Sequence, residues 1–381
     1  MICEDIWDKD YLKQLHDIDT LVSIHASPYE INKIEKRIKV MHDINQMGIH
    51  TIYVNQVGGQ DSLVFDGQSM VFDKNHELIA KAKAFDEDLL TVSLHNNQWH
   101  GKKEPPLTPD QEIYEALKLG SSDFIKKNGL KKSVLGLSGG IDSALALAIA
   151  ADSMGAKNVH AILMPSQYTA DASIEDAIAQ ANALGVSYEI IPIEPIVEVF
   201  KKTIQNPASL TLQNLQARVR GVLLMAYSNQ HQALLINTSN KSETAVGYGT
   251  LYGDMCGGYA PLQDIYKTKV YALAKYRNSL SPVIPERVIT RAPSAELAPN
   301  QKDEDDLPAY EILDELLIDV IENRLTEQQL QEKFNAEMVS KILRKIKISE
   351  FKRYQSPPGC KVTPVAFGKD WRIPITHHWK I

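Results

Sequence analysis

The spacing of apolar residues divides the chain near residue 111. Before that point, apolar runs of strand length at 19–27 and 49–55 flank an amphipathic helical pattern at 30–47, and residues 62–94 read as extended segments separated by turns. The run at 19–27 is apolar enough to predict a buried strand. This first part is therefore predicted to be a mixed α/β region whose last elements are β-strands.

From residue 111 onward, strand and helix patterns alternate. The predicted strands cover 132–137, 158–164, 187–193 and 233–239. The predicted helices cover 111–127, 141–154, 173–184, 195–204 and 211–229. Strands separated by helices of this length pair in parallel through right-handed crossovers, so the pattern predicts a doubly wound parallel sheet. Ligands of such a sheet bind beyond the carboxyl ends of the strands.

A polar, turn-rich stretch separates the two parts: NNQWHGKKEPPLTPDQE, at 96–112. We place the domain boundary there. The prediction is a first domain over 1–98, a linker over 99–110 and a second domain over 111–381.

Composition narrows the class of protein. The 381 residues are 44% hydrophobic and carry a net charge of −7, with basic residues in scattered short clusters, so no nucleic-acid partner is expected. Three cysteines are too few for a disulfide framework, and the chain opens on acidic residues, which together predict a cytoplasmic protein. The longest apolar run, ALALAIAA at 144–151, is well short of the ~20 residues that cross a bilayer, so no membrane span is expected.

A glycine turn joins the strand at 132–137 to the helix at 141–154, in the sequence SGGIDS at 138–143. Two adjacent glycines let the backbone turn tightly and expose N–H groups beside the positive end of the helix, which favours binding of a phosphate. The hydroxyls of two serines add hydrogen-bond donors. A carboxylate such as Asp142 beside a phosphate indicates a divalent cation that neutralises both negative charges. The alternative is a purely structural glycine turn with an Asx cap. The spacing of a Walker loop is absent.

The loop SGGIDS resembles that of the ATP pyrophosphatases, which cleave ATP between the α and β phosphates and transfer AMP to an acceptor. Four further segments resemble the NAD⁺ synthetases, in the family's order: LQNLQARVRG at 212–221, the loop INTSNKSETAVGYGTLYGDMCGGYAPLQDIYKT at 236–268, 293–314 and 356–376. The resemblance covers nearly all of 111–381. It implies a Rossmann-like, doubly wound ATP pyrophosphatase domain.

Carried over residue by residue, the resemblance implies three sets of site residues. The ATP contacts would be Ser138, Gly139, Gly140, Asp142, Ser143, Thr238, Lys267 and Ser294. Asp142 and Glu243 would also hold Mg²⁺, and Asp142, Glu243 and Lys267 would serve catalysis. Asn214, Arg218 and Asp254 would bind deamido-NAD⁺. Taken alone, a helix-face arginine or a loop glutamate is more often simply solvated.

The implied reaction is the ATP-dependent amidation of deamido-NAD⁺. Its nicotinate carboxylate is a weak electrophile, so it first attacks the α phosphorus of ATP, and ammonia then displaces AMP from the nicotinyl adenylate. The first step needs positive charge to offset the negative charge of three phosphates. The second step requires that water be excluded from the nicotinyl adenylate. The polar, acidic segment 294–310 is predicted to be a lid over the site, although 303–306 can equally favour the start of a helix at 307–322.

The opening MICEDIW resembles the nucleophile segment of the nitrilase-type glutaminases of glutamine-dependent synthetases, and 51–73 resembles a later part of that domain. The resemblance implies a partial nitrilase-type α/β sandwich with Cys3 as its nucleophile. The family's glutamate base and lysine precede the cysteine, so we expect a truncated glutaminase, an uncovered apolar sheet face, and ammonia as the effective donor unless the glutaminase is completed. The alternative reading of Cys3 is an inactive residue at a strand end.

Two other functions stay open at this point. One is a different ATP pyrophosphatase, such as a GMP synthetase or an RNA thiolase. The other is a non-catalytic nucleotide-binding partner. The family resemblance further implies a homodimer or a larger homo-oligomer.

Overall fold

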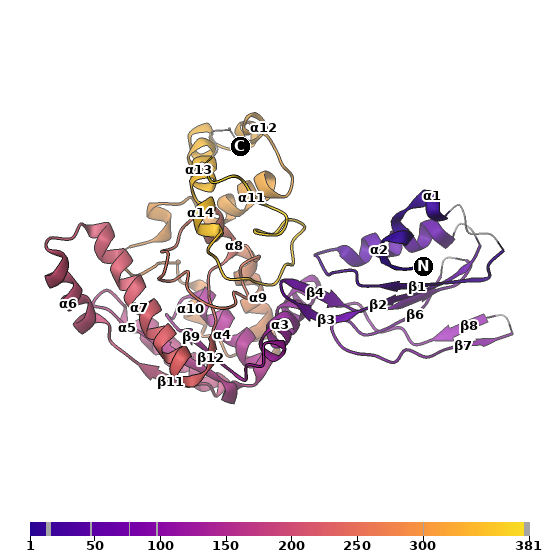
Figure 1. Ribbon diagram of the computed structural model, residues 1–381, viewed down its shortest axis with the longest axis horizontal. Helices are drawn as coiled ribbons and strands as arrows, with labels where there is room; N and C mark the ends of the chain where they lie inside the picture. The colour runs from indigo at the N-terminus through magenta and orange to yellow at the C-terminus, as the bar shows by residue number, and fades with distance from the viewer. Residues whose placement is uncertain (13–16, 46–47, 76, 97, 300, 377–381) are drawn as a thin grey trace. The chain divides into compact units, whose positions relative to one another are not determined.

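A computed structural model describes residues 1–12, 17–45, 48–75, 77–96, 98–299 and 301–376 (Figure 1). The chain forms two compact units, Met1–Asp123 and Phe124–Ile381. The division falls inside helix α3 (Pro109–Lys127), whose bounds agree closely with the helix predicted at 111–127. The predicted boundary at 99–110 stays a prediction. Part of that stretch lies in a strand, because β8 (Gln98–Gly101) pairs with β7 (Val92–His95).

The first unit is built on a mixed four-stranded sheet in the order β1-β2-β5-β6. Its strands are β1 (Thr20–His25), β2 (His50–Asn55), β5 (Met70–Phe72) and β6 (Leu78–Lys81). β1 and β2 pair in parallel across helix α2 (Lys33–Asn45), and the other pairs are antiparallel. The first unit also contains η1 (Cys3–Trp7), α1 (Lys9–Leu12), the hairpin of β3 (Val57–Gln60) and β4 (Leu63–Asp66), and the β7–β8 pair.

The strand predicted to be buried at 19–27 is buried on one face only. Alternate residues of β1 face the core under α2, while Val22 and Ile24 are 47% and 59% exposed. Val54 on β2 and Ile2, which bridges to Ile24, extend this apolar surface. The prediction of full burial was wrong, because among the described residues the core of this unit lies on the α2 side of the sheet. The apolar face expected from the sequence is present.

The second unit contains the predicted parallel sheet, in the order β11-β10-β9-β12. Its strands are β9 (Lys132–Gly136), β10 (Val159–Leu163), β11 (Ser187–Ile190) and β12 (Ala233–Leu235), all parallel. The helices between them are α4 (Ile141–Met154), α5 (Asp171–Leu184), α6 (Glu194–Ile204) and α7 (Ser209–His231). The chain adds strands on one side of β9 and then returns to the other, so the strand order reverses at β9. A ligand crevice is expected beyond the carboxyl end of such a reversal.

Helix α4 is central to this unit. Its segment 144–151 is buried on every side because it is apolar on every side, and it packs on β9, β10 and α9 (Lys267–Leu280). On the other flank α7 packs on β9 and β12. Helices α4 and α7 therefore both pack on the central strand β9, so residues from distant parts of the chain meet at the same edge of the sheet.

After β12, the described elements of the chain are helices. They include α8 (Lys241–Val246), α10 (Glu286–Thr290), η3 (Asp303–Asp305), α11 (Tyr310–Ile321), α12 (Glu327–Lys333), α13 (Ala336–Ile348) and α14 (Glu350–Arg353). On α13 the residues Val339, Ile342, Leu343 and Ile346 repeat at helical spacing and join one core with α8 and α11. Across the residues described, no helix combines the length and apolarity needed to cross a bilayer.

Candidate active site

The glycine loop lies between β9 and α4, as the sequence predicts. Gly139 has a φ of +82°, and a Cβ atom there would lie 2.2 Å from the carbonyl oxygen of Ser173, so only glycine fits. The two serines brace the turn: the Ser138 hydroxyl lies 3.0 Å from that of Ser143 and accepts the N–H of Gly140 at 3.2 Å. Ser138 is exposed at the start of the helix, where the first N–H groups of α4 have no partner inside the helix. The loop is therefore shaped to receive an anion.

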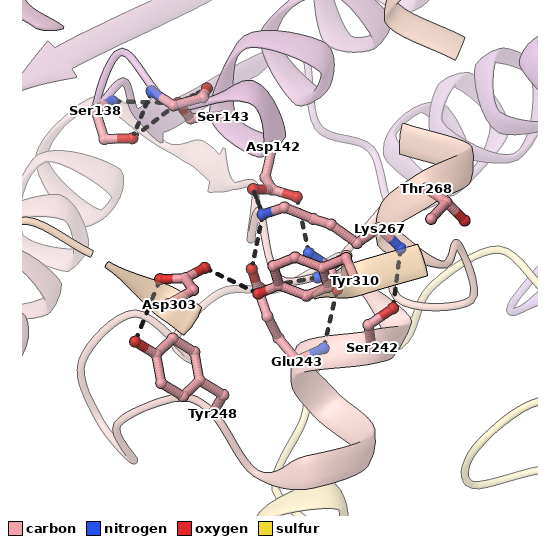
Figure 2. A network of polar contacts seen from close by, with 12 residues as sticks. Ser138, Asp142, Ser143, Ser242, Glu243, Tyr248, Lys267, Thr268, Asp303 and Tyr310 are labelled. Carbon is pink, nitrogen blue, oxygen red and sulfur yellow. Dashed lines mark hydrogen bonds and ion pairs between the residues drawn. The ribbon is translucent and has the colours of Figure 1, made fainter. Parts of the chain in front are cut away.

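Lys267 stands between two carboxylates beside this loop (Figure 2). Its ammonium group lies 2.5 Å from Oδ2 of Asp142 and 3.1 Å from Oε1 of Glu243, and its side chain is 2% exposed. Asp142 comes from the first turn of α4, Glu243 from α8 and Lys267 from the start of α9. We call these three residues the acid–lysine cluster. It brings together three residues that the sequence analysis named, across as many as 125 positions of sequence.

The charges of the acid–lysine cluster are strongly coupled. Burial raises the pKa of Glu243 to about 8; Lys267 opposes this rise, and the neighbouring Asp142 adds to it. Burial alone would lower the pKa of Lys267, but Asp142 and Glu243 outweigh it and the pKa is raised. One ammonium group thus serves two carboxylates that repel each other. A further positive group would relieve that repulsion.

Local structure explains how the cluster is held. Asn240 caps α8 by accepting the N–H of Glu243 at 2.9 Å, and its side-chain amide donates to Oδ1 of Asp142 at 2.8 Å. Asp314 accepts the N–H of Thr268 at 2.8 Å at the first turn of α9, and it also accepts the hydroxyl of Ser242. The Asn240 cap therefore fixes Glu243, and side chains of α8 and α11 that accept the first N–H groups of α9 fix Lys267.

Asn214, Arg218 and Asp254 form a second group, around the loop 249–257. The amide oxygen of Asn214 accepts the Thr250 hydroxyl at 2.8 Å, and Arg218 donates to the carbonyl of Leu251 at 3.2 Å. Asp254 accepts the N–H of Thr250 at 2.8 Å. Arg218 is exposed, so its remaining N–H groups are accessible to a ligand, whereas burial raises the pKa of the Asp254 carboxyl group.

Three named residues lie outside both groups. Thr238 lies between β12 and α8, and Ser294 lies after α10, where its hydroxyl donates to the carbonyl of Gln301 at 2.5 Å. Cys3 begins η1 in the first unit, with a φ of 47° and partial exposure. The lid predicted over 294–310 includes residue 300, which lies outside the described residues.

Two residues that shape the site were not predicted from the sequence. Asn240 was recognisable in principle, because an Asn with a Glu three positions later is a capping-box pattern. Lys352 gave no local signal: its ammonium group donates to the carbonyls of Gly247 and Gly249, both at 2.7 Å, from a helix about a hundred residues further on. A small cavity is lined by Glu243, Gly249 and Lys352 among others, and it connects the acid–lysine cluster with the loop 249–257.

No group of three or more His, Cys, Asp or Glu side chains within the described ranges is arranged to hold a metal ion. The protein itself therefore offers two carboxylates at the acid–lysine cluster. An ion there would need oxygen ligands from a bound molecule as well.

A glycine turn shaped to receive an anion, at the reversal point of a parallel sheet and beside a buried lysine and two acids, is typical of an α/β enzyme that uses a nucleotide. Residues 113–356 match the family model described as NAD synthase. The glutamine-dependent NAD(+) synthetase of Acinetobacter baylyi is 46% identical over 100% of this chain and 73% of its own length, and that of Aquifex aeolicus is 42% identical over 99% and 74%. The structure of the glutamine-dependent NAD⁺ synthetase from Acinetobacter baumannii, in complex with ADP, superposes with a TM-score of 0.75 at 44% identity, covering 98% of this chain and 71% of that one.

This chain belongs to the family of glutamine-dependent NAD⁺ synthetases, which are ligases that form a carbon–nitrogen bond. The family resemblance, the α/β fold with a parallel sheet and the enzyme class predicted from the sequence are thereby confirmed. The similarity along the whole chain does not favour the other ATP pyrophosphatases or a non-catalytic partner. The roles of individual site residues remain predictions.

Proposed function

We propose that this NAD⁺-forming ligase converts deamido-NAD⁺, ATP and ammonia into NAD⁺, AMP and pyrophosphate at the site beside β9. One observation carries the proposal: the acid–lysine cluster lies beside the glycine loop in a chain similar along its length to glutamine-dependent NAD⁺ synthetases. The nicotinate carboxylate attacks the α phosphorus and expels pyrophosphate. Ammonia then attacks the activated carbonyl and expels AMP.

The glycine loop and Lys267 bind the ATP phosphates in this proposal. The backbone N–H groups at the start of α4 and the hydroxyl of exposed Ser138 offer hydrogen bonds to phosphate oxygens. The ammonium group of Lys267 stays charged because two acids raise its pKa, so it can offset charge that develops on the phosphates. Thr238 and Ser294 add hydroxyl contacts. The protein thus contributes mainly position and positive charge.

The acid–lysine cluster also fits Mg²⁺. Two carboxylates from different helices converge on Lys267, and burial raises the pKa of Glu243 although Lys267 opposes the rise. Magnesium in nucleotide sites is commonly held by one or two carboxylates together with phosphate oxygens and water. Asp142 and Glu243 would hold the ion, which would neutralise phosphate charge and polarise the phosphorus. Asn240 keeps Asp142 turned toward this point through its 2.8 Å hydrogen bond.

Asn214, Arg218 and Asp254 bind deamido-NAD⁺ in this proposal. They surround the loop 249–257, which the small cavity connects with Glu243. A dinucleotide held there can direct its nicotinate carboxylate toward the α phosphate. Orientation of this kind replaces a random encounter with a bound geometry, which is a large part of catalysis in reactions of two substrates.

The nitrogen source is ammonia, and glutamine supplies it where a base and a lysine complete the site around Cys3. The thiolate would attack the glutamine amide, release ammonia and leave a thioester that water hydrolyses to glutamate. The proposal further includes a homodimer or larger homo-oligomer and a cytoplasmic location, both of which stay predictions.

The test is to supply the purified chain with ATP, Mg²⁺ and deamido-NAD⁺, and to measure NAD⁺ and AMP with ammonia or with glutamine freed of ammonia. Formation of NAD⁺ and AMP in equal amounts with ammonia is expected. Omission of deamido-NAD⁺ should abolish AMP formation. AMP formation that does not depend on deamido-NAD⁺, without NAD⁺, would contradict the proposal.

A further inference from the structure

Asp303 is a buried carboxylate beside the acid–lysine cluster, where its charge acts on Lys267. Its side chain is 4% exposed, although it belongs to a run of four acids whose other three members are exposed. It accepts the hydroxyl hydrogen of Tyr310 at 2.9 Å and that of Tyr248 at 3.2 Å (Figure 2). A buried carboxylate needs such donors, since an unpaired one would lose its hydration without compensation. Asp303 is thus the common acceptor of two tyrosines.

Each tyrosine connects Asp303 to a different wall of the site. Tyr310 begins α11, and its ring lies 5.1 Å from the ammonium group of Lys267, within the range of a cation–π contact. Tyr248 follows α8, two residues beyond its end, and lines the small cavity next to Glu243. Asp303 itself belongs to the stretch 301–307, defined here as the covering stretch. One carboxylate therefore joins the covering stretch to the start of α11 and to the residues that follow α8, the helix that carries Glu243.

The backbone strengthens this connection. The N–H of Asp303 donates to the carbonyl of Pro293 at 3.3 Å, and its carbonyl accepts the N–H of Leu307, a buried core residue. Burial and neighbouring carboxylates raise the pKa of both Tyr248 and Tyr310, so their hydroxyls remain protonated donors. Lys267 and Tyr310 are almost completely withdrawn from solvent in this arrangement.

We propose that Asp303 is a positioning residue of the synthetase site: through Tyr248 and Tyr310 it holds the covering stretch against Lys267 and keeps water from the activated intermediate. This inference rests on the proposed function. Water that reaches the nicotinyl adenylate attacks its carbonyl, releases AMP and regenerates deamido-NAD⁺, so ATP is consumed without product. A loosened covering stretch should therefore separate AMP formation from NAD⁺ formation.

The experiment compares Asp303→Asn and Tyr248→Phe with the wild type in ammonia-dependent synthesis, measuring AMP released per NAD⁺ formed. Asp303→Asn keeps the size of the side chain but weakens both hydrogen bonds, and Tyr248→Phe removes one hydroxyl alone. For Asp303→Asn we expect kcat for NAD⁺ to fall about tenfold, the value of one charged hydrogen bond, and the AMP:NAD⁺ ratio to rise above one. Asp306→Asn, which removes an exposed acid of the same run, is the matched control and should keep the ratio at one.

A double variant tests whether the two groups act together. If Tyr248 acts through Asp303, the Asp303→Asn/Tyr248→Phe variant should have an AMP:NAD⁺ ratio no higher than that of Asp303→Asn alone. If the rises in the AMP:NAD⁺ ratio of the two single variants add up in the double variant, the shared role is refuted. A ratio that stays at one in Asp303→Asn, with lower activity explained by less folded protein, would overturn the inference.

Proteolysis separates this inference from the proposed function. Lys302 is exposed at the start of the covering stretch, so trypsin cleavage after it reports local opening. Tyr248→Phe leaves the cleavage sequence intact and should be cut about tenfold faster than the wild type. Equal cleavage rates would overturn the inference whether or not the wild type makes NAD⁺, whereas failure of the wild type to make NAD⁺ would count against the proposed function alone.

Discussion

Gly139→Ala places a methyl group where the glycine loop touches helix α5. The Cβ atom would lie 2.2 Å from the carbonyl oxygen of Ser173 and 2.8 Å from its Cα, and these are backbone atoms that cannot rotate away. The backbone of Gly139 also has a φ of +82°, which costs a residue with a Cβ atom about 1–2 kcal/mol. Displacing the start of α5 adds about 1–3 kcal/mol, as overpacking of a filled interior does. The total expected loss of folding free energy is about 2–5 kcal/mol.

Gly140→Ala is the matched control for stability. It has a φ of −88°, and its Cβ atom would lie no closer than 3.4 Å, to the Ser138 hydroxyl. The two variants add the same methyl group to adjacent positions, so a difference between them reports the conformation and the clash. For Gly140→Ala we expect a change in folding free energy within about 0.5 kcal/mol.

Thermal unfolding provides the assay. The transition to follow is the one that ATP shifts upward, because binding to the folded state marks the unit that carries the loop. Gly139→Ala should lower that midpoint by about 5–15 °C and weaken the response to ATP. Equal midpoints for the two variants, together with an unchanged ATP response in Gly139→Ala, would refute the reasoning about this turn.

Four further outcomes are expected. Asp142→Asn should abolish AMP formation with the fold intact, because it removes charge from the acid–lysine cluster, and wild-type turnover at saturating Mg²⁺ would contradict this. Lys241→Met should destabilise the second unit by about 3–5 kcal/mol in urea unfolding, since this fully buried ammonium lies 2.9 Å from a buried aspartate that would lose its partner. Burial, followed by the charge of Arg37, lowers the pKa of His25 to about 4. The unfolded chain therefore binds more protons between pH 6.5 and 4, so stability should fall by roughly 2 kcal/mol as pH drops through that window, and His25→Gln should flatten the dependence in denaturant titrations. Cys3→Ala should leave ammonia-dependent NAD⁺ formation unaltered, because ammonia needs no thiol to reach the synthetase reaction; loss of that activity would contradict separate roles for the two units.

The local parts of this fold were predictable from the sequence because they depend on near neighbours. Helix 141–154 was predicted with the bounds that α4 has, since its apolar run follows a glycine turn. The order of strands and helices in 132–235 followed from the alternation of patterns, and the parallel sheet followed from the length of the crossovers. Gly139 was recognisable because a tight turn before a helix requires a residue without a Cβ atom at such a position.

The family resemblance predicted which residues belong to the candidate site. The chemistry of the residues alone predicted fewer of them. Asp142, Glu243 and Lys267 are separated by up to 125 positions, and nothing in their local sequence states that they touch. Residues important to the site also came from segments without a recognisable local pattern. Lys352 is one, and its hydrogen bonds to two glycine carbonyls emerge only when α14 packs on α8.

Burial was the property that the sequence described least well, since it depends on what covers an element. The apolar strand 20–25 leaves Val22 and Ile24 exposed. Lys241 and Asp303 are residue types that usually lie on the surface, but both are buried here. The partners of Lys241 lie 23 to 124 positions away in the sequence, and those of Asp303 lie 7 to 55 positions away. The sequence by itself determined the alternating strands and helices of 132–235, the glycine turn and the family, because backbone preferences and periodicity act over a few residues. The tertiary structure alone decided which charges meet at the acid–lysine cluster and which carboxylate joins the covering stretch to it, because those contacts depend on strand order and helix packing that no short stretch of sequence encodes.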